Sequence, residues 1–396
     1  MILDNELQFA KSVYRGYEEE YSKNVNGYKV GTTISIRKPA QFTVRTGATA
    51  AIQDVTEGFT QLAINNQVGT DFKFTSSDLT LKIGDLSERV IKPQMVQIAN
   101  KIDRDLAGLY TSVYNYTGTL GSTMNSFASY AKAQQRMDEM AVPQDMRMSV
   151  VSPADYWDTV SNLTSLFIQK SADPAYRKGS LGEVAGLDVM MSQNVNTFTA
   201  GTRTNGTVNG ANQEVTYSGS QANTYTQTLS VTGLGASATI AAGEVFTIAN
   251  VFAVNPVTKA VLTYPQQFVV TTAATASAGG VASLTISPAI ITSGAFQTVQ
   301  LASGTALPSG GAVTFAATAS TGYSQNLAFH KNAFALAVVP MERPPGAVDV
   351  ARETYKGVSV RVIPYYDGIN DVSSYRLDVL YGYSAIDPRL AVRMAR

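Results

Sequence analysis

The sequence predicts an α+β fold in which an all-β module interrupts a discontinuous domain. Three observations indicate this: a long helical pattern that ends near residue 116, strand-like alternation on both sides of it, and a loss of charge at residue 198. Between Phe198 and Gln325 the chain carries four charged side chains, whereas the other 268 residues carry 56. Such a difference in charge between neighbouring stretches is typical of separately folded parts.

The composition excludes several classes of protein. The chain has 396 residues, of which 44% are apolar, enough to bury a substantial core. Its 30 basic and 30 acidic residues cancel, so a protein that grips nucleic acid through a basic face is not expected, and long-range repulsion does not oppose self-association. The absence of cysteine excludes disulfides, thiolate metal ligands and a cysteine nucleophile. No signal peptide is visible and the longest apolar run, near Ala333–Met341, is too short to span a membrane, so we expect a cytoplasm-like compartment and no membrane partner.

The helical pattern is the longest regular signal in the chain. One face carries apolar residues at steps of three and four, namely Ile91, Met95, Ile98, Ile102, Leu106, Leu109 and Val113. Asp85 and Glu88 have the spacing of a capping box, and Pro93 is expected either to begin the helix or to kink it. From Pro93 to Tyr116 such a helix would span roughly 36 Å. Two interpretations stay open: an ordinary core helix, or the spine of an elongated subunit.

The residues before this helix predict an arm and a hairpin. Residues 1–30 suggest a helical arm, and from Thr33 to Leu81 the period changes to two. The alternating pairs are Ile34 and Ile36, Phe42 and Val44, Phe72 and Phe74, with a small, polar stretch at 46–56 between them. We therefore expect a long β-hairpin with a flexible tip. An isolated hairpin is only marginally stable, so it needs a surface, which a neighbouring subunit could provide.

The residues after the helix predict a mixed body. Ser126–Met140 suggests a helix and residues 148–151 a buried strand. Pro153 opens another helix, in which Trp157 is expected to anchor the core. A strand pair is expected over 184–195, with Gly186 in its turn.

The low-charge stretch and the residues after it predict strands. Within 198–325, β-type runs alternate with Gly and Asn turns and indicate a small barrel or sandwich: Thr226–Val231, Val245–Val254, Phe268–Thr272, Ser283–Ile286 and Val313–Ala317. Beyond Gln325, strands are expected at Ala335–Val339, Val358–Val362 and Tyr375–Tyr383. Residues 120–197 and 326 to the end are therefore expected to build one body, because insertion at a surface loop is well tolerated.

No catalytic constellation is found. His330 is the only histidine, and the chain contains no nucleophile-elbow motif, so a packing or interface role is expected for His330. No Gly is followed by Lys, which excludes a Walker-type phosphate loop. Asp367, Asn370 and Asp371 cluster in a turn, where solvated turn residues are more typical than a cation site. We predict a protein that is not an enzyme, without cofactor or metal.

Three blocks resemble one family. They are Asp71–Leu79 continuing through Ser87–Pro93, Tyr176–Gly179 with Val184–Asp188, and Asn326–Phe334. Together they are similar to the tailed-phage major capsid proteins, and most similar to the coat proteins of short-tailed lambdoid-type phages, whose central domain also carries an inserted β-barrel domain.

The resemblance implies a fold and its parts. The parts would be an N-terminal arm, an extended β-hairpin loop, a spine helix with a peripheral region, the first part of an axial domain, an inserted β-barrel, and the second part of the axial domain returning to the peripheral region. Their expected boundaries are 1–33, 34–84, 85–123, 124–197, 198–325 and 326–396.

The resemblance also implies a function. Subunits of this family form hexamers and pentamers of an icosahedral head that encloses double-stranded DNA. The implied partners are other copies of the chain, a scaffolding protein, a portal at one vertex and the packaged DNA, with assembly in the host bacterial cytoplasm. Two alternatives stay open: an encapsulin-like bacterial shell protein and a β-rich surface or adhesin module.

If the chain is a capsid subunit, charged residues in and beside the extended loop should pair across subunits. The candidate contacts are Arg45, Glu57, Asp71, Lys73, Glu88 and Arg89.

Overall fold

The computed structural model divides the chain into two compact units. The described residues are 7–22, 24–25, 28–29, 31–50, 52–75, 90–164, 181–217, 223–344, 350–355 and 358–395. Among them, the first unit draws on Met1–Ser35, Gln61–Ala107 and Phe334–Ala385, and the second on Ile36–Thr60, Gly108–Ala333 and Ile386–Arg396. Both units are therefore discontinuous in sequence. The six domain boundaries expected from the resemblance stay predictions.

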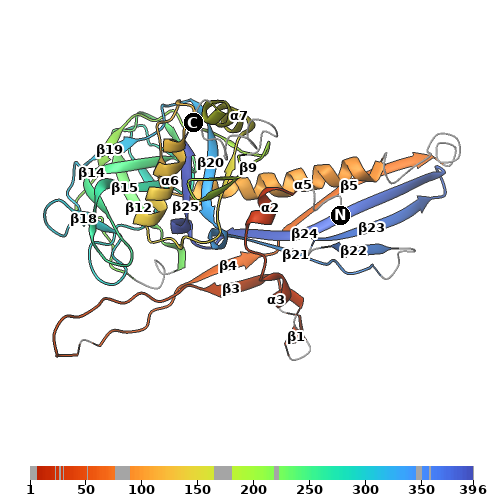
Figure 1. The fold of residues 1–396 in the computed structure, drawn as a ribbon, viewed down its shortest axis with the longest axis horizontal. Coiled ribbons are helices and arrows are strands. Elements are labelled where there is room, and N and C mark those ends of the chain that lie inside the picture. The colour runs from red at the N-terminus through yellow and green to blue at the C-terminus, as the bar shows by residue number, and fades with distance from the viewer. Residues whose placement is uncertain are drawn as a thin grey trace. The chain divides into compact units, whose positions relative to one another are not determined.

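The first unit is built on an antiparallel sheet of five strands. They are β5 (Asn66–Thr75), β21 (Phe334–Val339), β22 (Ala351–Tyr355), β23 (Val358–Asp367) and β24 (Val372–Ala385). The long strand β24 pairs with β21, β23 and β5, and β22 pairs with β23 (Figure 1). The three strands expected beyond residue 325 are confirmed, and all three are longer than predicted, β21 by a single residue.

The expected hairpin is present, but its paired strands are shorter than predicted and β5 is not part of it. The strand β3 (Thr33–Arg37) pairs with β4 (Phe59–Ala63), whereas β5 pairs with β24 along its whole length. Alternation in sequence gives the two faces of a strand but not its partner, and the partner of β5 lies about 300 residues away. Phe42 and Val44 lie in no strand, because the described residues between β3 and β4 are irregular. Residues 76–89 lie outside the described residues.

The predicted long helix is shorter than its apolar pattern. Helix α5 runs over Lys92–Ala107, and a 3-10 helix, η2 (Gly108–Ser112), follows it. Gly108 begins the tighter turn, since glycine is a poor helix former. Pro93 is the second residue of α5, and the two residues before α5 are π-helical, so the helical backbone begins ahead of Pro93. The expected capping box at Asp85 and Glu88 lies outside the described residues.

A buried aspartate of α5 holds the N-terminal arm. Instead of one helical arm, the chain forms α2 (Phe9–Ser12), α3 (Glu18–Ser22) and the short strands β1 (Asn24–Val25) and β2 (Tyr28–Lys29). The Asp103 carboxylate accepts hydrogen bonds from the backbone N–H groups of residues 8, 9 and 10, at 2.7, 3.1 and 3.0 Å. Burial raises the pKa of Asp103, and these three donors oppose the rise. Asp103 thus caps a helix too short to be stable alone.

The second unit contains a mixed sheet. Its strands are β6 (Tyr116–Thr117), β7 (Arg147–Val151), β8 (Glu183–Val184), β9 (Leu187–Met191), β10 (Thr197–Thr199), β20 (Gly322–His330) and β25 (Ala391–Ala395). Two short 3-10 helices, η3 (Lys331–Ala333) and η4 (Pro388–Leu390), complete this part. The pairs β7–β9 and β25–β6 are parallel and the others antiparallel. The predicted strand at 148–151 and the strand pair around Gly186 are confirmed.

Two helices pack on this sheet, and both were predicted. They are α6 (Phe127–Glu139) and α7 (Pro153–Thr164), and their apolar side chains share one buried cluster with side chains of β7, β9, β20 and β25. The prediction that Trp157 anchors the core is wrong, since its side chain is 53% exposed. Its neighbour Tyr156 is buried in the cluster instead, because adjacent residues lie on different faces of a helix.

The low-charge stretch contains a closed barrel. Of the two folds predicted for it, a barrel or a sandwich, the barrel is therefore correct. The strands β11, β12, β14, β15, β17 and β19 follow one another around it in the order β15-β17-β12-β11-β19-β14, and β14 pairs again with β15. Their bounds are Gly206–Val208, Gln227–Thr232, Val245–Val254, Val261–Val270, Ala282–Ser287 and Ala312–Phe315. Three further strands lie beside the barrel: β13 (Thr239–Ile240), β16 (Ala274–Thr275) and β18 (Val299–Leu301).

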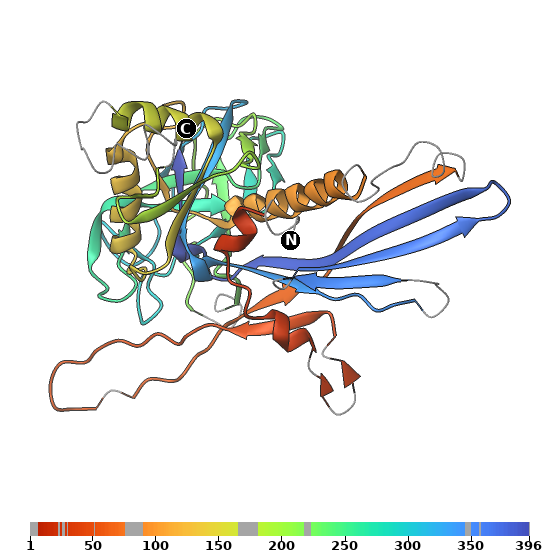
Figure 2. The ribbon, with the colours of Figure 1, turned by 45° about the vertical axis from the view of Figure 1, so that its right-hand side comes forward.

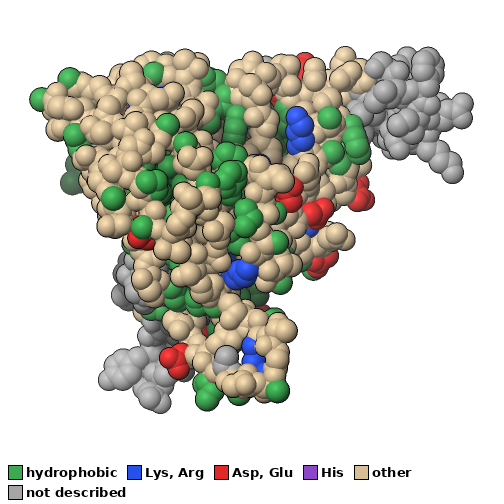
Figure 3. All heavy atoms as spheres, turned by 90° about the vertical axis from the view of Figure 1, so that its left-hand side faces the viewer, with side chains coloured by type: hydrophobic (Ala, Val, Ile, Leu, Met, Phe, Trp, Pro, Cys, Tyr) green, Lys and Arg blue, Asp and Glu red, His purple; other side chains and the backbone are tan. Residues whose placement is uncertain are grey.

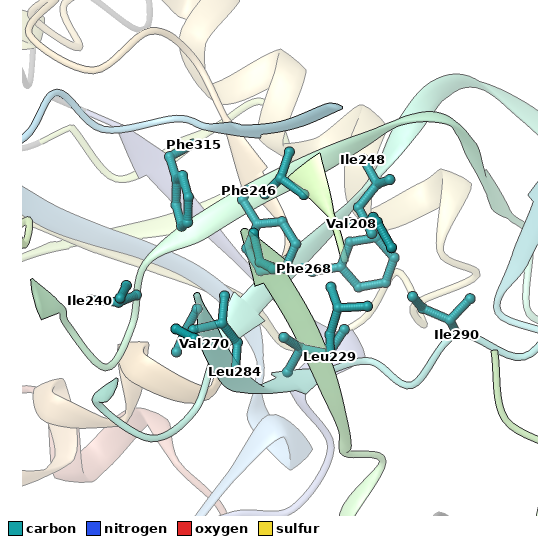
Figure 4. Close-up of a cluster of buried hydrophobic side chains, with 14 of the residues drawn as sticks. Val208, Leu229, Ile240, Phe246, Ile248, Phe268, Val270, Leu284, Ile290 and Phe315 are labelled. Carbon is teal, nitrogen blue, oxygen red and sulfur yellow. The ribbon is translucent and has the colours of Figure 1, made fainter. Parts of the chain in front are cut away.

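Aromatic and branched aliphatic side chains fill the barrel. Phe246 lies between Phe268 and Phe315, with ring centroids 5.6 and 5.5 Å apart, and Leu229 and Leu284 pack against them (Figure 4). This core confirms that the stretch folds despite its simple composition. Figure 3 shows a face of the molecule with few charged side chains. In the described part of the chain, no helix is both long and apolar enough to cross a membrane.

Candidate functional site

The loop between β3 and β4, residues 38–58, exposes apolar side chains. Its described residues, 38–50 and 52–58, form an extended ribbon without regular structure (Figure 2). Four large apolar side chains lie open to solvent, with exposed fractions of 54% for Phe42, 98% for Val44, 95% for Ile52 and 68% for Val55. Apolar side chains gathered on one exposed segment are typical of a surface that a partner covers.

The two arms of this loop are joined to each other. The Gln53 side chain accepts a hydrogen bond from the Thr43 N–H at 2.8 Å and donates one to the Thr43 carbonyl at 2.7 Å. The Lys38 N–H donates to the Gly58 carbonyl at 2.8 Å, where the two arms meet. The loop is therefore a narrow ribbon with a defined course.

Two of the candidate contact residues lie in this loop. Glu57 pairs with Arg37 of its own chain at 3.1 Å, and the two side chains are 42% and 83% exposed. The Arg45 guanidinium donates to the carbonyl of Gly47. An exposed ion pair contributes little to stability, so Glu57 is free to exchange partners at little cost.

The candidates Asp71 and Lys73 lie on β5, in the other unit. Both are exposed, and in the register of β5 with β24 they stand opposite Arg376 and Ser374. The other face of β5 carries Phe72 and Phe74, and the Phe72 ring stacks on Tyr375 with centroids 5.2 Å apart. Among the described strands, β5 pairs only with β24, so its outer edge is open.

The structure does not bring the six candidates together. Arg45 and Glu57 belong to the second unit, Asp71 and Lys73 to the first, and Glu88 and Arg89 lie outside the described residues. Whether these residues pair across subunits stays a prediction.

His330 lies in a packed environment. Its Nδ1 accepts a hydrogen bond from the Asn332 N–H at 3.2 Å, and its Nε2 lies 3.8 Å from the Asp145 carboxylate. Burial lowers the pKa of His330, with Asp145 opposing, so the ring is neutral at neutral pH. Asp367 accepts bonds from Ile369 and Asn370 within its turn, and the described residues contain no group of three metal-ligating side chains.

Asn326 has a role that sequence reasoning missed. Its side-chain oxygen accepts from the Ser152 N–H at 2.8 Å, and its amide donates to the Asp155 carboxylate at 2.7 Å. The Ser152 hydroxyl also donates to Asp155, and Ser152 is the residue before α7. Asn326 therefore joins β20 to the start of α7. The only sequence signal for Asn326 was that it is the first residue of Asn326–Phe334, one of the three blocks that carry the family resemblance.

Arg393 of β25 is a second buried connection. It is 2% exposed, and it donates to the carbonyls of Val113 and Gly243, each at 2.8 Å, and to the Gln325 side chain at 3.3 Å. Burial lowers the pKa of Arg393 to about 9, with Tyr110 opposing, which leaves the guanidinium protonated at neutral pH. One side chain thus links the end of η2, the barrel and β20.

Two of the four charged residues in the low-charge stretch form a buried ion pair. Arg203 Nε lies 2.6 Å from Glu244 Oε2, and the two side chains are 3% and 0% exposed. Glu244 also accepts bonds from the N–H groups of Gly201 and Ala241, at 2.6 and 3.1 Å. Arg203 donates to the Ala317 carbonyl at 2.8 Å and lies over the Phe315 ring. The pair therefore joins the segment that leads into β11 to the segment that follows β19.

Comparison with known families decides the identity. The family model described as P22 coat protein, gene protein 5, matches residues 2–395. The chain belongs to the P22 coat protein family. It is accordingly a major capsid protein of a tailed phage, a structural subunit of the icosahedral shell in the virion.

Solved structures agree with this coat protein fold. A chain of Mycobacterium phage Che8 is 15% identical and superposes with a TM-score of 0.53, over 98% of this chain and 90% of that one. Two more distant similarities are the capsid of Ralstonia phage GP4 (10% identity, TM-score 0.47, 98% and 91% covered) and that of cyanophage P-SCSP1u (11%, 0.46, 92% and 83%). No curated protein matches the sequence.

Membership of a coat protein family decides between the alternatives. It supports the phage shell over the bacterial compartment and the adhesin, and it implies a structural protein rather than an enzyme. The described features from which an assembly role can be argued are the exposed loop, the open edge of β5 and the barrel with its buried ion pair.

Proposed function

We propose that loop 38–58 holds neighbouring subunits of the shell together. The observation that carries this is the exposure of Phe42, Val44, Ile52 and Val55 on a single ribbon. Burying one such side chain contributes about 1.5–3 kcal/mol, so the four together provide enough free energy for a specific contact. The zero net charge of the chain places no long-range repulsion between copies.

We further propose that Arg45, Glu57, Asp71 and Lys73 pair with charges of adjacent subunits. All four are exposed, and the only strong ion pair among them, Glu57 with Arg37, is a surface pair. Charged groups around an apolar contact fix its register more than they strengthen it. Glu88 and Arg89 stay candidates on the resemblance alone.

The finer partners are proposals as well. Hexamers and pentamers as building blocks, a scaffolding protein, a portal at one vertex, packaged double-stranded DNA and assembly in the host bacterial cytoplasm all follow from the resemblance. A chain with equal numbers of acidic and basic residues has no strong overall attraction for DNA, which supports DNA entering after the shell has formed.

The apolar loop predicts an assembly defect without a folding defect. In the double variant V44S/I52S we expect at least a tenfold loss of assembled particles, because both side chains are more than nine-tenths exposed in the free subunit and gain a partner only on assembly. Sedimentation velocity and electron microscopy measure the particles, and thermal unfolding of the free subunit should be unchanged.

A matched control for this variant is I369S. Ile369 is 94% exposed in the turn between β23 and β24, outside loop 38–58. It should assemble as the unchanged protein does. Normal particle yield with V44S/I52S would contradict the proposal.

The charged residues of β5 predict a smaller effect of the same kind. D71N or K73Q should lower the yield of shells by several-fold while the free energy of unfolding changes by less than about 0.5 kcal/mol, since exposed substitutions are nearly neutral. Glu353→Gln, on the exposed strand β22 of the same sheet, is the control. Equal yields from all three variants would remove Asp71 and Lys73 from the interface.

A further inference from the structure

One residue of the inserted module touches both ends of loop 38–58. The Asn223 carbonyl accepts a hydrogen bond from Lys38 Nζ at 2.6 Å, and the Asn223 side-chain oxygen accepts one from the Phe59 N–H at 2.9 Å. Lys38 is the first residue of the loop, and Phe59 follows its last. Asn223 is separated from them by more than 160 residues in sequence, yet it lies in the same unit.

Lys38 is held more firmly than a surface lysine. It is 9% exposed, and its ammonium group lies 4.6 Å from the centre of the Tyr225 ring. Burial lowers the pKa of Lys38 to about 8, with Asp387 opposing and Arg389 adding to the decrease. The Lys38 ammonium group is thus largely removed from water. A backbone carbonyl and an aromatic ring of the protein take the place of that water.

The backbone beside Asn223 supports a positioning role. Tyr225 is buried and has a positive φ of 55°, a conformation that a bulky side chain rarely adopts. Strain of this kind persists only where surrounding contacts enforce it. Here the centre of the Tyr225 ring lies 4.6 Å from the Lys38 ammonium group and 5.4 Å from the Arg389 guanidinium. The strained turn thus presents Asn223 and Tyr225 together to the base of the loop.

We propose that the inserted barrel module sets the direction of loop 38–58, and that Asn223 is the residue that positions the neck of the loop, while Lys259 contacts Gln41 three residues farther along it at 3.4 Å. The neck of the loop, Lys38 and Phe59, is the partner that this surface binds. That this positioning assists shell assembly rests on the function proposed above for the loop. Because a loop held at both ends samples fewer orientations, the subunit loses less entropy when the loop docks on a neighbour.

The absence of cysteine allows a direct test on the full-length free subunit. Two nitroxide labels, at Ala48→Cys in the loop and Val257→Cys on the inserted module, report the distance distribution between them by pulsed electron paramagnetic resonance. Asn223→Ala is expected to widen this distribution about twofold or more, since it removes the acceptor for the Phe59 N–H. Asn223→Asp keeps that acceptor and should restore the narrow distribution.

Two controls separate positioning from general stability. Asn209→Ala removes an amide from the same module. The exposed Asn209 side chain donates from Nδ2 to the Ser230 hydroxyl at 3.2 Å, and its loss should leave the distribution unchanged. Thermal unfolding of Asn223→Ala should match that of the unsubstituted chain, because Asn223 lies outside the barrel core. A distribution that stays narrow in Asn223→Ala, or that widens equally in Asn209→Ala, overturns the inference.

Assembly rates of the unlabelled variants distinguish this inference from the proposed function. A widened distribution together with slower shell assembly supports both. A widened distribution with an unchanged assembly rate supports the role of Asn223 but contradicts the role proposed for the loop.

Discussion

Replacing Glu244 with alanine is expected to lower the free energy of unfolding by about 3–5 kcal/mol. The substitution leaves Arg203 charged and nearly fully buried without its partner. It also removes the acceptor for two backbone N–H groups, those of Gly201 and Ala241. An uncompensated buried charge is among the few causes of losses this large. Urea unfolding, followed by hydrogen exchange of the β14 amides, measures the loss where it occurs.

The matched double variant tests the cause. Arg203→Met combined with Glu244→Gln removes both charges and keeps similar volumes, so it should cost clearly less than Glu244→Ala alone. Glu214→Ala, which removes the other acidic residue of the low-charge stretch, should cost about 1 kcal/mol, since Glu214 accepts one bond from the Leu307 N–H. If the double variant is as unstable as Glu244→Ala, the loss has another origin than the unpaired charge.

Arg393→Ala is expected to destabilise the second unit by a similar amount, about 3–5 kcal/mol, because each buried acceptor left without a donor costs about 1–3 kcal/mol. The carbonyls of Val113 and Gly243 would both lose their donor. The contact of the guanidinium with the Tyr110 ring would be lost as well. Equilibrium unfolding in urea measures the change, and hydrogen exchange locates it.

Arg393→Lys is the informative partner of this variant. A lysine keeps the charge, but a single ammonium group does not reproduce the fork that reaches two carbonyls in different directions. We expect it to recover less than half of the loss. Full recovery would show that charge alone matters at this position, and a loss below 1 kcal/mol in Arg393→Ala would show that Arg393 is not the connection described above.

The sequence predicted the parts of the fold whose signal is local. The helix over 126–140, the helix after Pro153 and the runs of β14 and β17 all follow from periodicity and turn residues, and the structure confirms them. The end of α5 at Ala107 was missed, because the apolar spacing continues through the 3-10 helix. An α-helix repeats about every 3.6 residues and a 3-10 helix about every three, so apolar residues three or four apart lie on one face of either helix.

Pairings between distant segments could not be predicted in this way. The partner of β5 is β24, and nothing in residues 66–75 specifies it, because either face of an alternating strand fits many partners. The resemblance identified the family, but it did not reveal that Asp103 caps α2 or that Asn223 contacts Lys38. These are single polar residues whose role depends on what the fold brings beside them.

The candidate site was predicted in part for the same reason. The loop was located from its polar stretch at 46–56, and the exposure of Val44 and Ile52 is what strand alternation did not predict. In a strand, the apolar face that carries Val44 and Ile52 would be expected to pack against the rest of the chain. In the irregular ribbon both side chains stay exposed to solvent, and we expect a neighbouring subunit to cover them.

Closure of the barrel bears on one kind of assembly error, the pairing of strand edges between inserted modules of different subunits. Each of the six strands β11, β12, β14, β15, β17 and β19 pairs with a barrel strand on both sides, so the ring closes and none of them has an edge that is unpaired from end to end. Growing shells crowd many copies of this module together, and at such concentrations open strand edges would recruit one another without regard to sequence. We therefore expect the modules of neighbouring subunits to contact one another through side chains more than through strand pairing.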